Sequence, residues 1–312
     1  MNQPRRVLVT GHTGLVGHGI ARHLRNRGYE VWGASRKPEE GGEEDAPAVR
    51  VDLACRRSVE ELQALLPSMD AVVHAAAALP GHGSIRSLRD YFTINVLGTS
   101  RLLEMWSARE SPGPFVYVST TAVVRSRSSY IDEQQPYLPS NGYALSKTMA
   151  EILCRRARRD PFEPTILRIR APYGYRGRRE GVVARFVDAA LSGSDLVVWG
   201  GGTRRQTFTF VEDVGRCAEL ALLHRAGGVF HVAGPQSVST RELAEEILRA
   251  LPSCRSRIVT SPKRDPQEGR DIFVSTEKAF RVLGYQPAHS LPEGLRKVFA
   301  WRLEQDAQGA TG

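Results

Sequence analysis

The sequence has few cysteines and no long apolar run, and these shortages exclude several classes of protein. Its 312 residues include four scattered cysteines, Cys55, Cys154, Cys217 and Cys254, with no Cys-x-x-Cys pair and no histidine at ligand spacing. We therefore expect reduced thiols, no disulfide framework and no metal site. No apolar stretch approaches the roughly 20 residues that span a bilayer. The first residues lack a secretory-signal pattern, so we expect a cytoplasmic protein without a membrane partner.

A concentrated basic surface is also missing, although basic residues outnumber acidic ones by 43 to 34. The arginines are spread along the chain, and no basic stripe alternates with aromatic side chains, so no nucleic-acid partner is expected. A basic cleft for a phosphate-bearing small molecule accounts for part of the formal charge of +9 equally well.

The chain opens with the pattern of a strand, a tight turn and a helix. Residues 7–10 are β-formers, and Gly11, Gly14 and Gly17 follow at G-x-x-G-x-x-G spacing. Glycines let the backbone turn sharply and approach a pyrophosphate, while a helix N-terminus offers unpaired N–H groups. The pattern predicts a dinucleotide-binding turn; a strand–helix turn without a ligand is the alternative.

Strand and helix patterns alternate through the first half of the chain. Strands are predicted at 29–35, 49–53, 70–77, 115–119 and 166–169, and helices at 58–66 (capped by Ser58), 90–109 and 143–158. Such alternation predicts parallel βαβ units in a doubly wound α/β sheet. We expect residues 1–170 to form a Rossmann dinucleotide-binding domain.

The second half has shorter elements and glycine-rich turns. We expect residues 171–312 to form mainly a smaller C-terminal substrate lobe, with segments near 206–235 returning to the sheet. The predicted elements are strands at 208–211 and 229–232 and helices at 213–223, 240–251 and 291–303. Ser239 and Glu242 have the spacing of a capping box. The polar tail, residues 305–312, is expected to fray.

Tyr143 and Lys147 lie one turn apart on one face of a predicted helix. An ammonium group near a phenol stabilises the phenolate and lowers the tyrosine pKa from about 10. Such a tyrosine exchanges a proton with a carbinol or ketone oxygen while hydride moves at the adjacent carbon. A solvated helix face is the alternative for this pair alone.

Three hydroxyl side chains, Ser119, Thr120 and Thr121, stand at the end of the predicted strand 115–119. Ligands of open α/β sheets bind at the carboxyl ends of the strands. One of these hydroxyls can therefore hydrogen-bond the reacting oxygen beside Tyr143. Ordinary strand-end polarity accounts for at least one of the three.

Together these motifs resemble the extended short-chain dehydrogenase/reductases, the NAD(P)-dependent sugar epimerase, dehydratase and reductase family. The residues that carry the resemblance are Gly11, Gly14 and Gly17, Asp52-Leu53, His74–Ala77, Asn95-Val96-x-Gly98-Thr99, Val118–Thr120, Tyr143-x-x-x-Lys147, Pro172–Gly174, Phe210–Val214 and Leu283–Pro287. The resemblance covers nearly the whole chain. It implies that Thr120 is the catalytic hydroxyl, Tyr143 the acid/base, and Lys147 the phenolate stabiliser and ribose binder.

The same resemblance implies a set of cofactor contacts. Asp52 would contact the adenine amine, and Ala75–Ala77 would pack along the cofactor. The predicted cofactor residues are Gly11, Thr13, Gly14, Leu15, Val16, Gly17, Ser35, Arg36, Lys37, Asp52, Leu53, Ala75, Ala76, Ala77, Asn95, Val118, Tyr143, Lys147 and Pro172.

Family members distinguish their cofactors at the end of the second strand, where an acid favours NAD and an arginine accommodates a 2′-phosphate. Ser35-Arg36-Lys37 stands there, with no acid before Glu39. Arg36 can pair with a phosphate or stack on adenine, and Lys37 adds a point charge. Two basic residues on a solvated loop are the alternative. We predict NADPH rather than NAD.

The resemblance also implies a nucleoside-diphosphate sugar as substrate. In such members an arginine ahead of the F-V-x-D-V stretch often clamps the pyrophosphate, but Gln206 holds that position, after Arg204 and Arg205. The predicted substrate residues are Thr120, Thr121, Arg178, Arg179, Arg205 and Arg270. A plain surface position is the alternative for each arginine.

We therefore predict an NADPH-dependent ketoreductase of a nucleotide-activated keto-deoxysugar, as in deoxysugar biosynthesis, with hydride from nicotinamide C4 and a proton from Tyr143. No Asp-Glu pair follows Thr120, which argues against 4,6-dehydration. The alternatives are an NAD-dependent nucleotide-sugar epimerase, a reductase of a non-sugar ketone or aldehyde, and a non-catalytic dinucleotide sensor. A homodimer through the helices near 90–109 and 143–158 is expected from the family.

Overall fold

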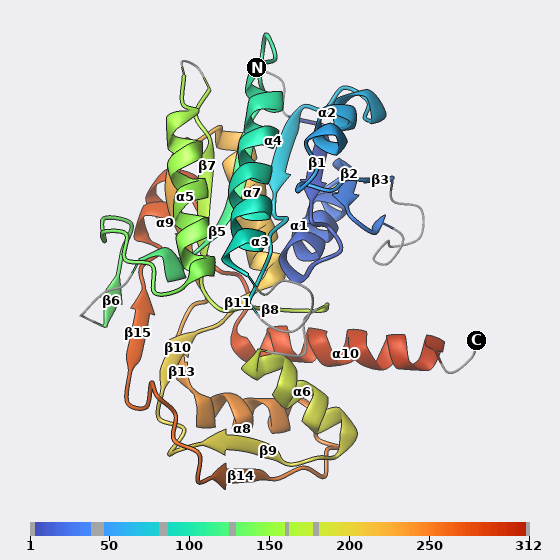
Figure 1. Cartoon of the computed structure of the whole chain (residues 1–312). Helices are drawn as coiled ribbons and strands as arrows, with labels where there is room; N and C mark the ends of the chain where they lie inside the picture. Colours follow the sequence, from blue (N-terminus) through green and yellow to red (C-terminus); the bar gives the residue numbers. More distant parts are fainter. Residues whose placement is uncertain are drawn as a thin grey trace.

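A parallel β-sheet forms the centre of the molecule (Figure 1). The computed structural model describes residues 4–38, 47–80, 87–124, 129–159, 162–176 and 181–309. Within these residues the sheet has seven strands in the order β12-β7-β5-β4-β1-β2-β3. Their bounds are β1 Arg6–Thr10, β2 Glu30–Ser35, β3 Ala48–Arg50, β4 Ala71–His74, β5 Phe115–Thr120, β7 Thr165–Ile169 and β12 Gly228–Val232. The order reverses between β1 and β4, so the predicted doubly wound Rossmann sheet is confirmed.

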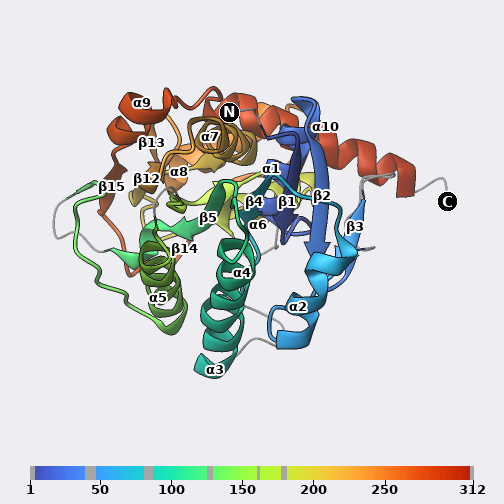
Figure 2. The ribbon, with the colours of Figure 1, turned by 90° about the horizontal axis from the view of Figure 1, so that it is seen from above.

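Helices cover both faces of the sheet (Figure 2). One layer holds α1 (Leu15–Asn26) and α7 (Val211–His224), and the other holds α2 (Arg56–Leu65), α4 (Gly98–Ser107) and α5 (Gly142–Arg156). Strand β1 serves both layers because successive side chains point to opposite faces. Val7 and Val9 pack with α1 and α7, whereas Leu8 packs with α2 and α4.

Helices α1 and α7, nearly 200 residues apart in the sequence, pack closely together. A Cβ atom at Gly19 of α1 would lie 2.4 Å from Cβ of Val211, at the start of α7. The same layer includes Phe230 of β12. The second half of the chain therefore supplies both a covering helix and an edge strand of the central sheet.

Most of the remaining elements form a smaller lobe below the sheet in Figure 1. They are β6 Tyr130–Ile131, β8 Pro172–Tyr173, α6 Val182–Ser192, β9 Leu196–Trp199, β10 Arg205–Thr207, β11 Thr209–Phe210, β13 Ser237–Ser239, α8 Thr240–Ala250, β14 Ile258–Ser261, β15 Asp271–Val274 and α10 Leu291–Gly309. Helix α9 (Glu277–Leu283) instead packs against α7 and β12 beside the central sheet. Strands β13, β10, β15 and β6 form one sheet, and an apolar core joins α6, α8, α10 and β9. None of the described helices has the combination of length and apolar character needed to cross a membrane.

Several local predictions need correction. The helix expected over 90–109 begins earlier and is divided into α3 (Leu88–Tyr91), a π-helical stretch (Phe92–Leu97) and α4. Ser58 does not cap α2, because that helix already begins at Arg56; the Ser58 hydroxyl instead accepts from the Asp52 N–H. The strand expected at 208–211 is interrupted at Phe208, between β10 and β11.

The helix ends in the second lobe follow the sequence more closely. Ser239 and Glu242 form the predicted capping box, with each side chain accepting from the other residue's backbone N–H. At the C-terminus, α10 continues to Gly309, so residues 305–309 are helical rather than frayed.

Candidate functional site

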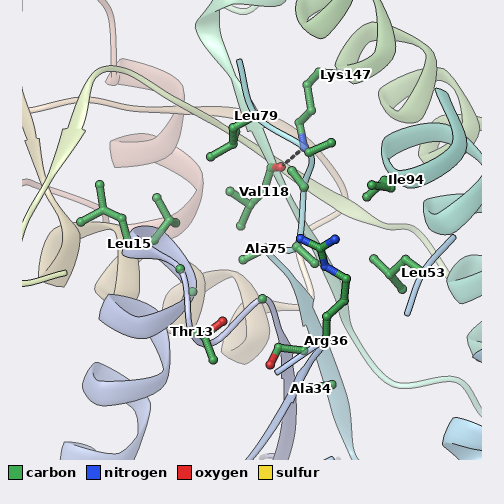
Figure 3. Close-up of a pocket in the computed structure, with 18 of the residues that line it drawn as sticks. Thr13, Leu15, Ala34, Arg36, Leu53, Ala75, Leu79, Ile94, Val118 and Lys147 are labelled. Carbon is green, nitrogen blue, oxygen red and sulfur yellow. Dashed lines mark hydrogen bonds between the residues drawn. The ribbon is translucent and has the colours of Figure 1, made fainter. Parts of the chain in front are cut away.

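A cavity of about 390 Å³ opens at the carboxyl edge of the central sheet (Figure 3). It is lined by the glycine turn, the ends of β2, β5 and β7, the segment after β4 and the start of α5. Of the predicted cofactor residues, only Asn95 does not line it. The structure adds residues that the motifs did not single out, Ala34, Val51, Ala78, Leu79, Ile94 and Ile169, and Ser119, predicted only as a strand-end hydroxyl, also lines the cavity.

The turn before α1 can hold a phosphate group closely. Gly11 has φ +71°, a left-handed conformation that favours glycine, and a Cβ atom there would lie 2.6 Å from Cα of Ala76. Gly14 directly precedes α1, and no side chain caps the helix. The N–H groups of its first turn are therefore available to an anion at this wall of the cavity.

A buried hydrogen-bond chain holds the segment after β4 against this turn. Thr10 Oγ1 donates to Nδ1 of His74 (2.7 Å), and Nε2 of His74 donates to Thr99 Oγ1 (3.0 Å). This direction follows because Thr99 donates its own proton to the Asn95 carbonyl, while Thr10 accepts from the Ala76 N–H. Burial lowers the pKa of His74 to about 3, so the ring is neutral.

Asn95, in the π-helical stretch, lies one layer behind the cavity. Its side chain brackets Ala78, accepting from the N–H (2.6 Å) and donating to the carbonyl (3.0 Å). It also donates to Ser146 Oγ on α5 at 2.9 Å. Because the side chain is buried and fully bonded, Asn95 positions the cavity wall rather than lining it.

Tyr143 and Lys147 both reach the cavity from the first turns of α5. Asn141 caps this helix by accepting from the Ala144 N–H. The Tyr143 ring stands edge-on to Tyr91, with centroids 6.2 Å apart. Nζ of Lys147 donates to the Val118 carbonyl at 2.6 Å, the dashed contact in Figure 3. Burial lowers the pKa of Lys147 to about 7, and the nearby Glu151 carboxylate opposes this shift.

The three predicted hydroxyls have different surroundings. Ser119 lines the cavity but donates its proton to Glu151 Oε1 at 2.5 Å. Thr121 is buried and does not line the cavity, which corrects its prediction as a substrate residue. Thr120 lines the cavity, and its Oγ1 accepts from the Ala122 N–H at 3.2 Å. Thr120 is therefore the hydroxyl whose proton can be donated to a bound oxygen.

Glu151, one turn after Lys147 on α5, anchors a buried polar network. Its carboxylate accepts from Ser119, from the Tyr137 hydroxyl (2.9 Å) and from Arg168 on β7 (2.7 Å). Both charged side chains of the pair are almost completely buried, with exposures of 1% for Arg168 and 0% for Glu151. Motif reading missed this pair, although the spacing of Lys147 and Glu151 places both on one helix face.

Basic side chains dominate one end of the cavity. Ser35, Arg36 and Lys37 continue from β2, and in Figure 3 the Arg36 side chain extends past Ala75. Asp52 is the one carboxylate lining the cavity among the described residues, and it accepts from the Ala54 N–H at 3.0 Å. This end of the cavity therefore suits a phosphate group.

A second cavity of about 190 Å³ lies in the smaller lobe. It is lined by Val182, Arg185, Phe186, Val197, Trp199, Arg204, Gln206, Thr240, Asp265, Pro266 and Gln267. Nζ of Lys263 lies 3.8 Å from the Trp199 ring centroid, and the Arg185 guanidinium lies 5.5 Å from it. A planar aromatic wall beside polar and basic groups can take a heterocyclic base.

Two of the predicted substrate arginines, Arg205 and Arg270, do not line either of these cavities. Arg205 points to the other side of β10, because alternate side chains of a strand face opposite ways, and it pairs with Glu242 at 2.9 Å. Arg270 is exposed and lines neither cavity. Arg204, in contrast, lines the second cavity. Arg178 and Arg179 lie outside the described residues.

Known proteins resemble this chain over almost its whole length. The sequence model described as "NAD dependent epimerase/dehydratase family" matches residues 7–233. A dTDP-glucose 4,6-dehydratase of Streptomyces antibioticus is 30% identical over 96% of this chain and 93% of its own length. The structure of the Thermus thermophilus UDP-glucose 4-epimerase in complex with NAD is 26% identical, with a TM-score of 0.80 over 95% of this chain and 99% of that one. MoeE5 in complex with UDP-glucuronic acid and NAD is 27% identical, also with a TM-score of 0.80, over 96% and 99%.

Proposed function

The chain belongs to the NAD-dependent epimerase/dehydratase family, and from this premise we propose that it reduces a keto group of a nucleotide-linked sugar with NADPH. One observation carries the proposal: the basic residues Arg36 and Lys37 line the same cavity as Thr120, Tyr143 and Lys147. A bound dinucleotide supplies hydride to the carbonyl carbon. The protein supplies the binding, the orientation and the proton.

The glycine turn and the basic end of the cavity fit a phosphorylated dinucleotide. The close approach at Gly11 leaves room for backbone contact, and the uncapped start of α1 favours negative charge. Arg36 suits a 2′-phosphate because a guanidinium binds phosphate oxygens bidentately. The epimerase and MoeE5 structures are described with NAD. The NADPH part of the proposal therefore depends on Arg36 and Lys37 alone.

Proton transfer is assigned to Tyr143, with Thr120 and Lys147 in supporting roles. In the proposed reaction the Thr120 hydroxyl donates to the substrate carbonyl oxygen and orients it. Tyr143 then gives its proton to that oxygen as hydride arrives at carbon. In its protonated form, Lys147 stabilises the phenolate that remains. Substituting phenylalanine for Tyr143 should abolish turnover while leaving dinucleotide affinity unchanged, as measured by kinetics and calorimetry.

Elimination of water is not part of the proposal, although the Streptomyces antibioticus relative is described as a 4,6-dehydratase. Thr121 and Ala122 occupy the two positions after Thr120 where an Asp-Glu pair is expected for that reaction. Neither side chain exchanges protons near neutral pH. The site therefore supports proton and hydride transfer at one carbon.

We propose a nucleoside-diphosphate sugar as the substrate, with its base in the second cavity beside Trp199. The relatives described with UDP-glucuronic acid and as UDP-glucose 4-epimerase act on or bind such molecules. Thermal-shift measurements with UDP, dTDP and GDP test this part, because a ligand that binds only the folded protein raises its melting temperature. No shift with any of them would favour a non-sugar ketone.

An NAD-dependent nucleotide-sugar epimerase is the second candidate, favoured by the NAD in the related structures. An epimerase recycles its bound nicotinamide, so it would isomerise the sugar without net change at 340 nm. The reductase instead consumes NADPH in proportion to product. Tightly bound NAD in the purified protein, together with isomerisation, would overturn the reductase proposal.

Arg36 provides the sharpest test of the cofactor. Replacing it with serine should weaken NADPH binding by about 10- to 100-fold, because a charge-assisted contact to phosphate is lost. Affinity for NADH should stay unchanged. Arg57→Ser is the matched control, since Arg57 is exposed on α2 and pairs with Glu61 away from the cavity. Equal losses for NADPH and NADH in Arg36→Ser would contradict a 2′-phosphate contact.

A homodimer through α4 and α5 is also proposed. Leu145 and Ile152 of α5 carry exposed apolar side chains, as does Leu97 at the end of the π-helical stretch that leads into α4. Such side chains are suited to a helix–helix interface. Mass photometry at micromolar protein should show the dimer, and Ile152→Glu should reduce it to monomer.

A further inference from the structure

Two arginines approach one buried glutamine between the two cavities. Arg170 directly follows β7, and Arg204 directly precedes β10. Each donates from Nη2 to Gln206 Oε1, at 3.2 and 3.3 Å. Gln206 therefore holds two guanidinium groups close together, at the position where the sequence pattern called for a single arginine.

Among the described residues, no carboxylate neutralises Arg170. Its Nε is sealed from solvent and has no hydrogen-bond partner. The nearest acid to Arg204 is Asp265, at 3.9 Å. Burial, and secondarily the charge of Arg204, lower the pKa of Arg170 to about 10. Arg170 is only partly buried, but two guanidinium groups held close together, with no carboxylate on Arg170 among the described residues, favour the binding of an anion.

The backbone around Arg170 is fixed at the edge of the first cavity. Ile169, which lines that cavity, pairs in register with Thr120 on β5. Ala171 has φ +35°, a left-handed conformation that is strained for alanine. Thr209 holds the bend, because its hydroxyl donates to the Arg170 carbonyl and its N–H to the Ala171 carbonyl. Strain kept in place at a strand end is typical of a ligand site.

The residues that flank the two arginines in the sequence line different cavities. Ile169 and Pro172, on either side of Arg170, line the catalytic cavity, whereas Arg204 and Gln206 line the cavity beside Trp199. Arg170 itself lines neither of these two cavities, and its link to the second one is the hydrogen bond that it donates to Gln206.

We propose that Arg170 and Arg204 together form an oxyanion subsite for the substrate, with Arg170 as the residue that determines affinity. The ligand group is a phosphate or carboxylate of a nucleotide sugar, bound by two guanidinium groups that Gln206 orients. This inference rests on the proposed function for the identity of the substrate, and on the geometry alone for the anion. Guanidinium groups bind such oxygens bidentately, which matches their donor pattern.

Calorimetry on the NADPH-loaded enzyme tests the subsite. In Arg170→Met, affinity for UDP-sugars should fall at least about tenfold, and Arg170→Lys should show a smaller loss because it keeps the charge. Arg281→Met is the matched control, since Arg281 is exposed on α9, pairs with Glu277 and lines neither cavity, and it should bind as the wild type does. Wild-type affinity in Arg170→Met would overturn the proposal.

Three ligands identify the group that is bound. Equal losses for UDP, UDP-glucose and UDP-glucuronic acid assign the diphosphate, whereas a loss confined to UDP-glucuronic acid assigns a sugar carboxylate. If the wild type bound no nucleotide sugar, the proposed function would fail. Inorganic pyrophosphate would then still test the subsite: binding that Arg170→Met abolishes supports it, and its absence in the wild type overturns it.

Discussion

Arg168 and Arg170 stand two residues apart at the end of β7, and their guanidinium groups have opposite surroundings. Arg168 donates to both carboxylate oxygens of Glu151, which also accepts from Ser119 and Tyr137. Arg170 donates to a neutral amide and meets a second arginine. The fully buried charge of Arg168 is balanced within the protein, whereas the partly buried charge of Arg170 is balanced by a ligand only in our proposal.

The comparison separates two uses of a buried arginine. A charge pair that is complete within the protein fixes the structure, and breaking it leaves the surviving charge uncompensated. A cation that lacks its partner in the free protein destabilises the fold and contributes its interaction energy when an anion binds. Breaking the Arg168 pair should therefore mainly lower stability, whereas substituting Arg170 should mainly weaken ligand binding.

The largest effect is expected on breaking the complete pair. Glu151→Gln should lower the free energy of unfolding by about 3–5 kcal/mol, because Arg168 remains buried without its counter-charge. Urea unfolding measures the loss. The double variant Glu151→Gln/Arg168→Met removes both charges and should recover most of it; a double variant as unstable as the single one would contradict the ion-pair explanation.

Lys147 is a third buried basic residue, and its effect on stability can be followed as a function of pH. Burial lowers its pKa from 10.5 to about 7. Between these values the unfolded chain holds a proton that the folded chain has released, so stability rises with pH in this window. The unfolding free energy of the wild type minus that of Lys147→Met should therefore rise by up to about 1.4 kcal/mol per pH unit from pH 7 to 9.

Urea unfolding of the free protein at pH 7, 8 and 9 measures this difference. Lys263→Met serves as a control, because Lys263 is exposed and lies in the smaller lobe. A difference between wild type and Lys147→Met that did not change with pH would mean that Lys147 is charged, and therefore compensated, throughout.

The smallest effect on stability is expected at Arg170. Arg170→Met loses one long hydrogen bond but also removes an unpaired charge, so the free energy of unfolding should change by no more than about 1 kcal/mol, with a gain rather than a loss expected. Thermal and urea unfolding without ligand measure it. A loss above about 2 kcal/mol would mean that Arg170 stabilises the fold as Arg168 does, and it would contradict the proposed difference between the two residues.

The sequence predicted the central sheet and most of the first cavity wall because their signals are local. Gly11, Gly14 and Gly17 fix a turn by their own spacing, and Tyr143 and Lys147 share a helix face through one turn of geometry. Family resemblance extended these local signals to Arg36 and Thr120, and the structure brings both to the same cavity.

The remaining features depend on register and on distant contacts. Arg204 and Arg205 are indistinguishable in the sequence, and only the phase of β10 decides which one faces the second cavity. Arg170 and Gln206 meet across 36 positions, through a bend at Ala171 that no motif marks. The π-helical stretch before α4 keeps an ordinary helical pattern of apolar residues, so its wider turn was invisible.

The contact between α1 and α7 bears on how the protein is made. The sheet that begins at Arg6 lacks its outer strand until Val232 has been synthesised, and the apolar face of α1 stays uncovered until α7 is in place. A nascent chain emerging from the ribosome thus carries an incomplete core across most of its translation. The early segments cannot complete their packing until the late ones have been synthesised, so the chain is most prone to aggregation during translation.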